Sequence, residues 1–201
     1  MLRTRRCSRS DAGRGDTGGA VSSRVMRTIL TVAAVAAVVA AAADGAANTR
    51  FVSKMYRYSI VLPGEWMSRP ASVPWTGGPP RLTSPEIDLY VRASDGRAVT
   101  VSAVPVRRSS TLRKWTRSFV DTAPAAAACT TRGGLRPSTL GGAPALSFEG
   151  RCSGAAHDFV MAATVRGGRA YLLALVSPSS YSGASDRRVF ETVRRSFRFV
   201  R

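Results

Sequence analysis

The hydrophobic pattern of residues 56–66, YRYSIVLPGEW, predicts a β-strand with one apolar face. Large side chains occupy every second position, as one face of a strand requires: Tyr56, Tyr58, Ile60 and Leu62. Pro63-Gly64 ends this strand, because proline lacks an amide hydrogen and glycine permits a sharp turn. Trp66 follows at once, and we expect its large apolar side chain to fold back over the sheet.

Alternating apolar positions predict further strands downstream. The first two strands flank Ser94-Asp95-Gly96, and Asp-Gly between extended segments is a strong hairpin signal. The later strands are separated by Gly141-Gly142, Ser153-Gly154 and Gly167-Gly168. The glycine pairs, Gly133-Gly134 among them, are interpreted as turns. Residues 171–176, YLLALV, are apolar on both faces, which is typical of a central strand. The predicted strands are Glu86–Ala93, Arg97–Val106, Leu135–Leu140, Ala143–Cys152, His157–Arg166 and Arg169–Val176.

Two segments have the period of an amphipathic helix. Leu112, Trp115 and Phe119 form an apolar stripe within Ser109–Thr122, and we expect this helix to end near Pro124. A second helix is predicted over Ser185–Arg195, followed by a final strand through Phe197 and Phe199. The basic residues of both helices are predicted to lie in solvent as two separate cationic patches that could contact a partner: Arg113, Lys114 and Arg117 on the first, and Arg187, Arg188, Arg194 and Arg195 on the second.

Residues Met67–Pro85 contain five prolines, so we expect them to hold neither a helix nor a central strand. Trp75 lies in the middle of this stretch. It has two interpretations: it pins the loop onto the domain, or it belongs to a loop that binds a partner.

The strand that ends in LPGEW and the last helix running into SFRF, within Phe190–Val200, resemble the PsbP/Mog1-like fold family. This fold includes many small secreted actinobacterial proteins, and the resemblance covers about Phe51–Arg201. It implies an α+β domain in which a central antiparallel β-sheet is flanked by two or three helices. It also implies a non-catalytic binding or assembly role. No metal-binding or GTPase-binding motif of the family can be placed on these residues.

Residues Ile29–Ala43 form an uncharged apolar run that follows Arg24 and Arg27 and precedes small residues. These are the three parts of a secretory signal, so we expect export and cleavage after Ala47. Residues 1–47 would then be a polar extension plus signal peptide, with translation starting at Met26 as an alternative, and residues 48–201 a single domain. An uncleaved segment that retains the protein at the membrane is the other interpretation of this run.

The composition is strongly basic, with 30 Lys and Arg against 12 Asp and Glu. Residues 48–201 hold 23 of these basic and nine of these acidic residues, so their net charge is +14. Arginine accounts for nearly all of the excess, which a GC-rich genome also produces through codon usage. We expect no nucleic-acid partner, because no basic run carries interleaved aromatic residues and no nucleic-acid-binding motif is present. The expected partner is an unidentified protein or an anionic envelope component, with weak association to a membrane surface, and the protein is expected to be a monomer.

Cys129 and Cys152 are the two cysteines of residues 48–201, and two cysteines of an exported domain most simply form a disulfide. A metal site that adds His157 and Asp158, or two free thiols, are the alternatives.

Catalytic patterns are not recognised in the sequence. The chain has one histidine, no serine lies in a G-x-S-x-G elbow, and the glycine pairs lack a phosphate-loop context. We therefore predict no catalytic, cofactor or metal residues. The expected function is that of an exported, non-enzymatic binding or accessory protein of the cell envelope. A hydrolase or metal-dependent enzyme with an unfamiliar arrangement is the alternative.

Overall fold

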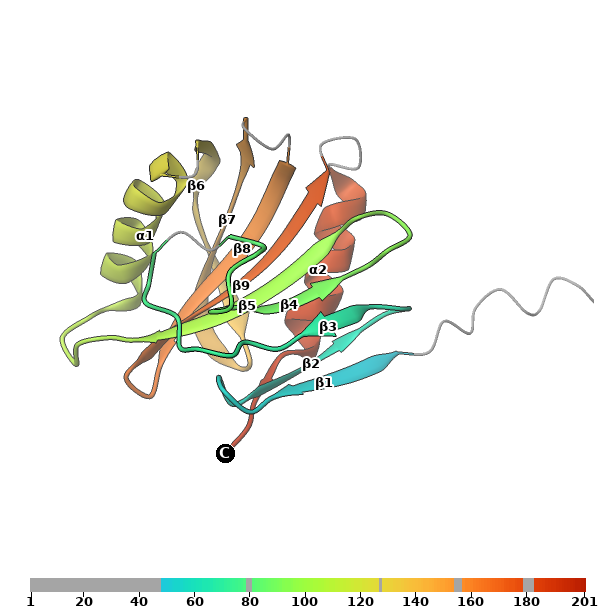
Figure 1. Ribbon diagram of the computed structural model, residues 1–201. Coiled ribbons are helices and arrows are strands. Elements are labelled where there is room, and N and C mark those ends of the chain that lie inside the picture. Colours follow the sequence, from blue (N-terminus) through green and yellow to red (C-terminus); the bar gives the residue numbers. More distant parts are fainter. Residues whose placement is uncertain (1–47, 79–80, 127, 154–156, 179–182) are drawn as a thin grey trace, which may run out of the picture. The chain divides into compact units, whose positions relative to one another are not determined.

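A seven-stranded antiparallel sheet organises the part of the protein that the computed structural model describes (Figure 1). Residues 48–201 are described, except for 79–80, 127, 154–156 and 179–182. The predicted signal segment 29–43, its cleavage site and Met26 lie outside the described residues. The strands follow one another across the sheet in this order: β3 (Met67–Arg69), β4 (Asp88–Val91), β5 (Ala98–Pro105), β9 (Arg169–Pro178), β8 (His157–Arg166), β7 (Ala143–Cys152) and β6 (Cys129–Leu140).

A second, three-stranded antiparallel sheet has β2 at its centre. Its strands are β1 (Thr49–Ser53), β2 (Tyr58–Leu62) and β10 (Arg198–Phe199). The predicted apolar face is confirmed, because the side chains of Tyr56, Tyr58, Ile60 and Leu62 are all buried. The sequence pattern did not predict β1 or β3. Both are short, and β3 is an edge strand with three exposed residues, so neither shows a burial alternation of its own.

Two helices cover the large sheet, α1 (Leu112–Ala126) and α2 (Ala184–Ser196), so the described residues hold two helices and not three. Phe119 of α1 packs against Phe148 of β7, with ring centroids 6.3 Å apart. The next residue of β7, Glu149, accepts a hydrogen bond from Arg187 of α2. Neighbouring residues of a strand point to opposite faces, so α1 and α2 lie on opposite faces of the sheet. None of the described helices is both long and apolar enough to cross a bilayer.

Helix α1 continues two residues beyond Pro124, whereas the sequence predicted an end near that proline. A proline so close to the end of a helix removes one backbone hydrogen bond from the last turn and leaves the rest of the ladder intact.

The core confirms the predicted central position of residues 171–176. Leu172, Leu173 and Leu175 of β9 are at most 1% exposed, with β5 on one side of the strand and β8 on the other. Trp66 folds back as predicted, and its indole Nε1 donates to the carbonyl oxygen of Pro63 at 3.0 Å. The hairpin at Ser94-Asp95-Gly96 is also confirmed, since β4 pairs with β5 in antiparallel register.

The interpretation of Gly133-Gly134 as a turn is wrong. Both glycines lie inside β6, where the pairing with β7 shifts register between Arg132 and Arg136. Gly133 has a φ of +69°, a conformation that glycine adopts at no steric cost, so the strand absorbs extra residues as a bulge without ending.

Candidate functional site

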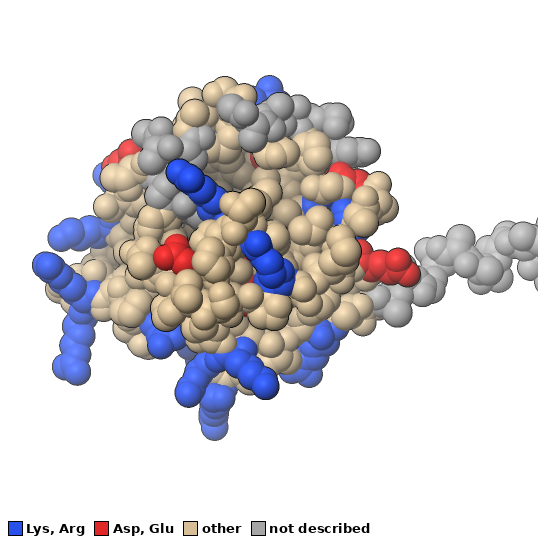
Figure 2. Space-filling model, viewed as in Figure 1, with Lys and Arg blue, Asp and Glu red and all other residues tan. Residues whose placement is uncertain are grey.

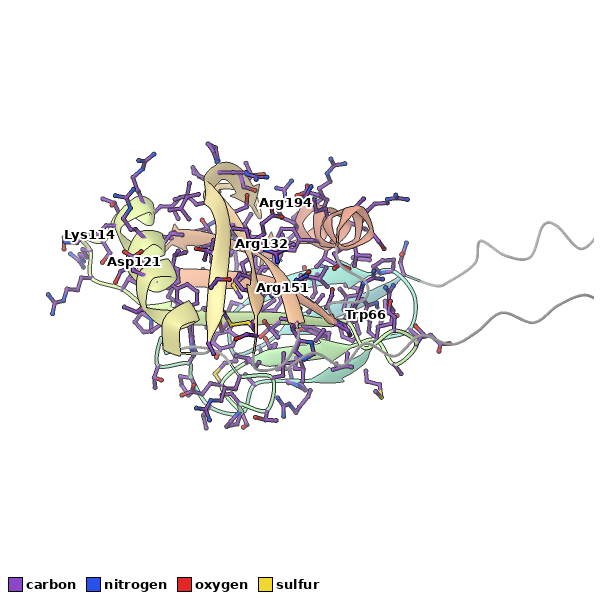
Figure 3. The ribbon with its side chains drawn as sticks, turned by 90° about the horizontal axis from the view of Figure 1, so that it is seen from above. Trp66, Lys114, Asp121, Arg132, Arg151 and Arg194 are labelled. Carbon is purple, nitrogen blue, oxygen red and sulfur yellow. A yellow bond between two sulfur atoms is a disulfide. The ribbon has the colours of Figure 1, made fainter. Side chains whose placement is uncertain are left out.

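Two adjoining cavities of about 150 and 140 Å³ lie between α2 and the sheet. Both are lined by Arg132, Glu149, Val160 and Arg187, and the larger one also by Arg136. We call the space around these three arginines and Glu149 the arginine cleft. Figure 3 shows Arg132 over the strands of the sheet, on the side of α2.

The β6 bulge brings two of the cleft arginines together. Arg132 pairs with Glu149 and Arg136 pairs with Ser147, so four residues along β6 advance only two positions along β7. Two positions along a strand correspond to roughly 7 Å, against roughly 13 Å for four. Residues 147 and 149 share a face, so both arginines lie on the face that α2 covers.

The cleft has more positive charge than its own carboxylate neutralises. Arg136 and Arg187 each approach the Glu149 carboxylate, at 3.5 and 3.3 Å. Their side chains are 63% and 61% exposed, and ion pairs between exposed groups are weak. Glu191 also lines the larger cavity, and its carboxylate pairs with Arg194 and Arg195. Arg132, Arg136 and Arg187 therefore lie around the Glu149 carboxylate alone, and an anion from solvent could bind them through paired N–H donors.

Two further carboxylates line the smaller of the two cavities, which we call the inner cavity, and each has an arginine partner. Asp158 accepts a 2.6 Å hydrogen bond from Arg151, and this bond raises the pKa of the Arg151 guanidinium. Asp186 accepts a 2.7 Å bond from Arg97. These carboxylates are neutralised in place, so they do not cancel the charge of the cleft arginines.

The basic residues predicted on the first helix are all exposed: Arg113, Lys114 and Arg117. Figure 3 shows Lys114 projecting from α1 away from the strands. Arg113 and Arg117 also line a cavity of about 260 Å³ between α1 and β6, which reaches Gly134. Arginines therefore lie on both sides of the β6 bulge.

On the second helix the prediction of solvated residues holds for three residues, since Arg187, Arg188 and Arg195 are exposed. It is wrong for Arg194, whose side chain is only 14% exposed. Arg194 forms an ion pair with Glu191, and its Nη1 donates to the carbonyl oxygen of Thr139 at 2.6 Å. It joins α2 to the end of β6 because its position on the helix lies beside that strand, as Figure 3 shows.

Trp75 does not offer its ring to a partner. The side chain is 2% exposed and packs edge-on against Trp115 and Phe119 of α1, and its Nε1 donates to the carbonyl oxygen of Gly78 at 2.9 Å. Of its two interpretations, the structure supports the one in which it pins the proline-rich loop to the domain.

The predicted disulfide is confirmed between Cys129 and Cys152, which are paired residues of β6 and β7. Its sulfur atoms are bonded to each other, so the alternative metal site with His157 and Asp158 loses both of its thiolate ligands. Within the described ranges no three His, Cys, Asp or Glu side chains gather as metal ligands would.

Sequence reasoning missed Arg132, Arg136 and the cleft that they form. The available signal was the segment Arg132–Arg136, RGGLR, in which two arginines flank a glycine pair. Interpreting the glycines as a turn placed the arginines on different elements, whereas a bulge keeps them on one strand face.

A larger groove of about 640 Å³ lies between β1 and the β3–β4 edge, with Asp88 and Tyr90 among its lining residues. The Asp88 carboxylate is 1% exposed and already accepts hydrogen bonds from the Tyr58 hydroxyl at 2.8 Å and the Ala71 amide at 2.7 Å. The bond from Tyr58 of β2 joins the small sheet to β4 of the large one, and the bond from Ala71 holds the loop that follows β3, so Asp88 has a structural role.

Comparison with protein-family models finds no match, and comparison with curated protein sequences finds none either. Solved structures do show a similar fold. The cyanobacterial PsbP (CyanoP) of Synechocystis sp. PCC 6803 matches with a TM-score of 0.56 and 16% identity over 77% of this chain and 93% of its own. The Ran-binding protein Mog1p of Saccharomyces cerevisiae matches with a TM-score of 0.51 and 12% identity over 77% and 96%. LpqN of Mycobacterium tuberculosis, involved in cell envelope biogenesis, matches with a TM-score of 0.44 and 12% identity over 80% and 88%. The order of the elements and the matches to CyanoP and Mog1p agree with the resemblance seen in the sequence: the protein has the PsbP/Mog1-like fold.

Proposed function

We propose that this protein is an exported, non-enzymatic binding or accessory protein of the cell envelope, and that its arginine cleft holds an anionic envelope component. The observation that carries the proposal is the gathering of Arg132, Arg136 and Arg187 around the carboxylate of Glu149. Guanidinium groups are the side chains best suited to bind carboxylate or phosphate groups through two parallel hydrogen bonds.

The charge of the surrounding surface supports an anionic partner. Lysine and arginine side chains project from much of the face seen in Figure 2, and acidic side chains are few there. A surface of one charge raises the local concentration of oppositely charged partners and speeds their association. Some of the arginine excess nevertheless has a structural role, as the buried Arg97 and the Arg166 guanidinium 4.4 Å from the Phe199 ring show.

The Cys129–Cys152 disulfide supports a place outside the cytoplasm, because disulfides persist in oxidising compartments. It fits the signal-like residues Ile29–Ala43. Fractionation followed by sequencing of the mature N-terminus tests export, with an N-terminus near Asn48 expected. Recovery of the intact chain from the cytoplasm would contradict it.

Retention on envelope material tests the cleft. The double variant Arg132→Gln/Arg187→Gln removes two cleft charges, and the control Arg107→Gln/Arg108→Gln removes two exposed charges outside the cleft. We expect the cleft variant to elute from isolated envelopes at clearly lower salt than the control, because a specific site adds to the screened general attraction. Equal elution of the two variants would mean that only net charge matters, and would remove the cleft from the proposal.

A further inference from the structure

The inner end of the arginine cleft lies beneath the first turn of α2. The cavity of about 140 Å³ is lined there by Gly183, Asp186 and Arg187 of the helix start, by Arg132 of β6 and by Ser177 of β9. It is far larger than the roughly 15 Å³ that one water molecule needs.

The start of α2 leaves amide hydrogens without a side-chain cap. The N-cap residue is Gly183, and no side-chain cap hydrogen bond is present. The first hydrogen bond of the helix runs from the amide of Arg187 to the carbonyl oxygen of Gly183, so the amides of the preceding turn have no partner within the helix. Free amides and the helix dipole together favour an anion at this point.

A second, independent observation comes from the opposite wall of the cavity. The Ser177 side chain is 1% exposed, and its Oγ has no hydrogen-bond partner among the described residues. Buried hydroxyl groups are rarely left unpaired, because losing water without a replacement partner costs free energy. Ser177 pairs in register with Asp158, which lines the same cavity, so its hydroxyl lies on the cavity side of the sheet.

The charges around the cavity favour an anion over a cation. Asp158 and Asp186 are each bonded to an arginine outside the cavity, at 2.6 and 2.7 Å. Arg132 has no partner among the described side chains. Arg187 donates two long hydrogen bonds, both of 3.3 Å, to the Glu149 carboxylate, and this contact is weak because the Arg187 side chain is 61% exposed.

We infer that this cavity is a binding site for a phosphoryl group, either free phosphate or the end of a phosphate monoester. Donors reach it from three directions: the Arg132 guanidinium from β6, the first-turn amides from α2 and the Ser177 hydroxyl from β9. A planar carboxylate has two oxygens in one plane, whereas a tetrahedral phosphoryl group presents three or more oxygens in different directions and can use all three donors. This inference rests on the proposed function in that it names the ligand class of the same cleft.

The test uses the purified mature protein and titrates inorganic phosphate and glycerol 3-phosphate separately by calorimetry, with acetate for comparison. We expect phosphate to bind more tightly than acetate. The tighter of the two phosphoryl ligands tells whether a free or an esterified group is preferred.

Three variants locate the site. Ser177→Ala should weaken phosphate binding about tenfold, as the loss of one hydrogen bond to a charged group does, and Arg132→Gln at least about tenfold. Arg107→Gln, at an exposed position outside the cleft, should leave binding unchanged. Since the Ser177 hydroxyl has no partner, Ser177→Ala without ligand should keep or raise the thermal unfolding temperature, which separates loss of binding from loss of structure.

Phosphate binding that is equal in the parent, Ser177→Ala and Arg132→Gln would overturn the inference, as would an equal loss in Arg107→Gln. Loss of envelope retention in the cleft variant with no phosphate binding by the parent would leave the proposed function standing and refute the phosphoryl site. Phosphate binding that depends on Ser177, with unchanged envelope retention, would support the site and refute the envelope role.

Discussion

The Nε of Arg97 donates a 2.7 Å hydrogen bond to Oδ1 of Asp186, and the side chains of both residues are almost completely buried. This ion pair joins the start of β5 to the first turn of α2. The Arg97 guanidinium also contacts the Asp95 carboxylate at 2.7 Å and the Ser185 hydroxyl at 2.8 Å. One arginine of the β-hairpin therefore positions the helix end that covers the inner cavity.

Arg97→Met should destabilise the protein by about 3 kcal/mol, because it leaves the Asp186 carboxylate buried without its partner. Chemical denaturation monitored by tryptophan fluorescence measures this free energy of unfolding. The double variant Arg97→Met/Asp186→Leu should recover much of the loss, since it removes the carboxylate that the single variant leaves unpaired. Arg188→Met, at an exposed position of α2, is the control and should change stability by less than about 0.5 kcal/mol. A single variant as stable as the control would show that the pair contributes little.

Reduction of the Cys129–Cys152 disulfide should lower the free energy of unfolding by about 3 kcal/mol, because a cross-link over a sequence separation of 23 restricts the unfolded chain. Denaturation of the mature protein with and without a reducing agent gives the difference, and the variant Cys129→Ser/Cys152→Ser should match the reduced protein. Thiol labelling of the unreduced, denatured mature protein should find no reactive thiol. Two reactive thiols per mature chain would rule the disulfide out.

Gly150→Ala should destabilise the protein by about 1–3 kcal/mol through overpacking. A β-carbon at this position would lie closer than 3.0 Å to the backbone oxygen of Thr130 and to the ring of Phe159, and the backbone oxygen cannot move aside alone. Gly134→Ala is the matched control, because a β-carbon there meets nothing within 4 Å. Thermal unfolding of the two variants should therefore differ, and equal melting temperatures would contradict the packing between β6, β7 and β8.

Stability should fall as the pH rises from about 10 towards 12. Burial raises the pKa of Tyr56 to about 12, and burial also raises the pKa of Tyr58 and of Tyr90. Tyrosines of the unfolded chain ionise near pH 10, so above that pH the unfolded state binds fewer protons than the folded state. The stability that these neutral hydroxyls provide is complete below pH 10 and is lost above it.

Denaturation at pH 8 and pH 11 checks the direction of this change, and tyrosinate absorbance of the folded protein reports the pKa values themselves. A constant free energy of unfolding across this range, or ionisation of all tyrosines of the folded protein near pH 10, would contradict the burial of these three hydroxyls.

The sequence by itself determined the parts of this protein that depend on local periodicity. Alternation identified β2 and the meander of β7, β8 and β9, and a 3.6-residue period identified α1 and α2, because the side chains of one element share a face only at those spacings. Two cysteines in a domain expected to be exported sufficed to predict the disulfide. The aromatic strand and the last helix also carried enough of the fold to recognise its resemblance.

Only the tertiary structure decided where the cleft arginines and the unpaired Ser177 hydroxyl meet. Nothing local distinguishes the exposed Arg188 from Arg194, which bonds to the carbonyl oxygen of Thr139 across 55 positions of sequence. The arginine cleft depends on the register of β6 against β7, on a bulge that resembles a turn in sequence, and on the placement of α2 over Ser177. Pairing of strands and docking of helices join residues that are far apart in the chain. The packing of the whole core sets the strand register and the helix positions, so the pattern of one segment alone does not predict them.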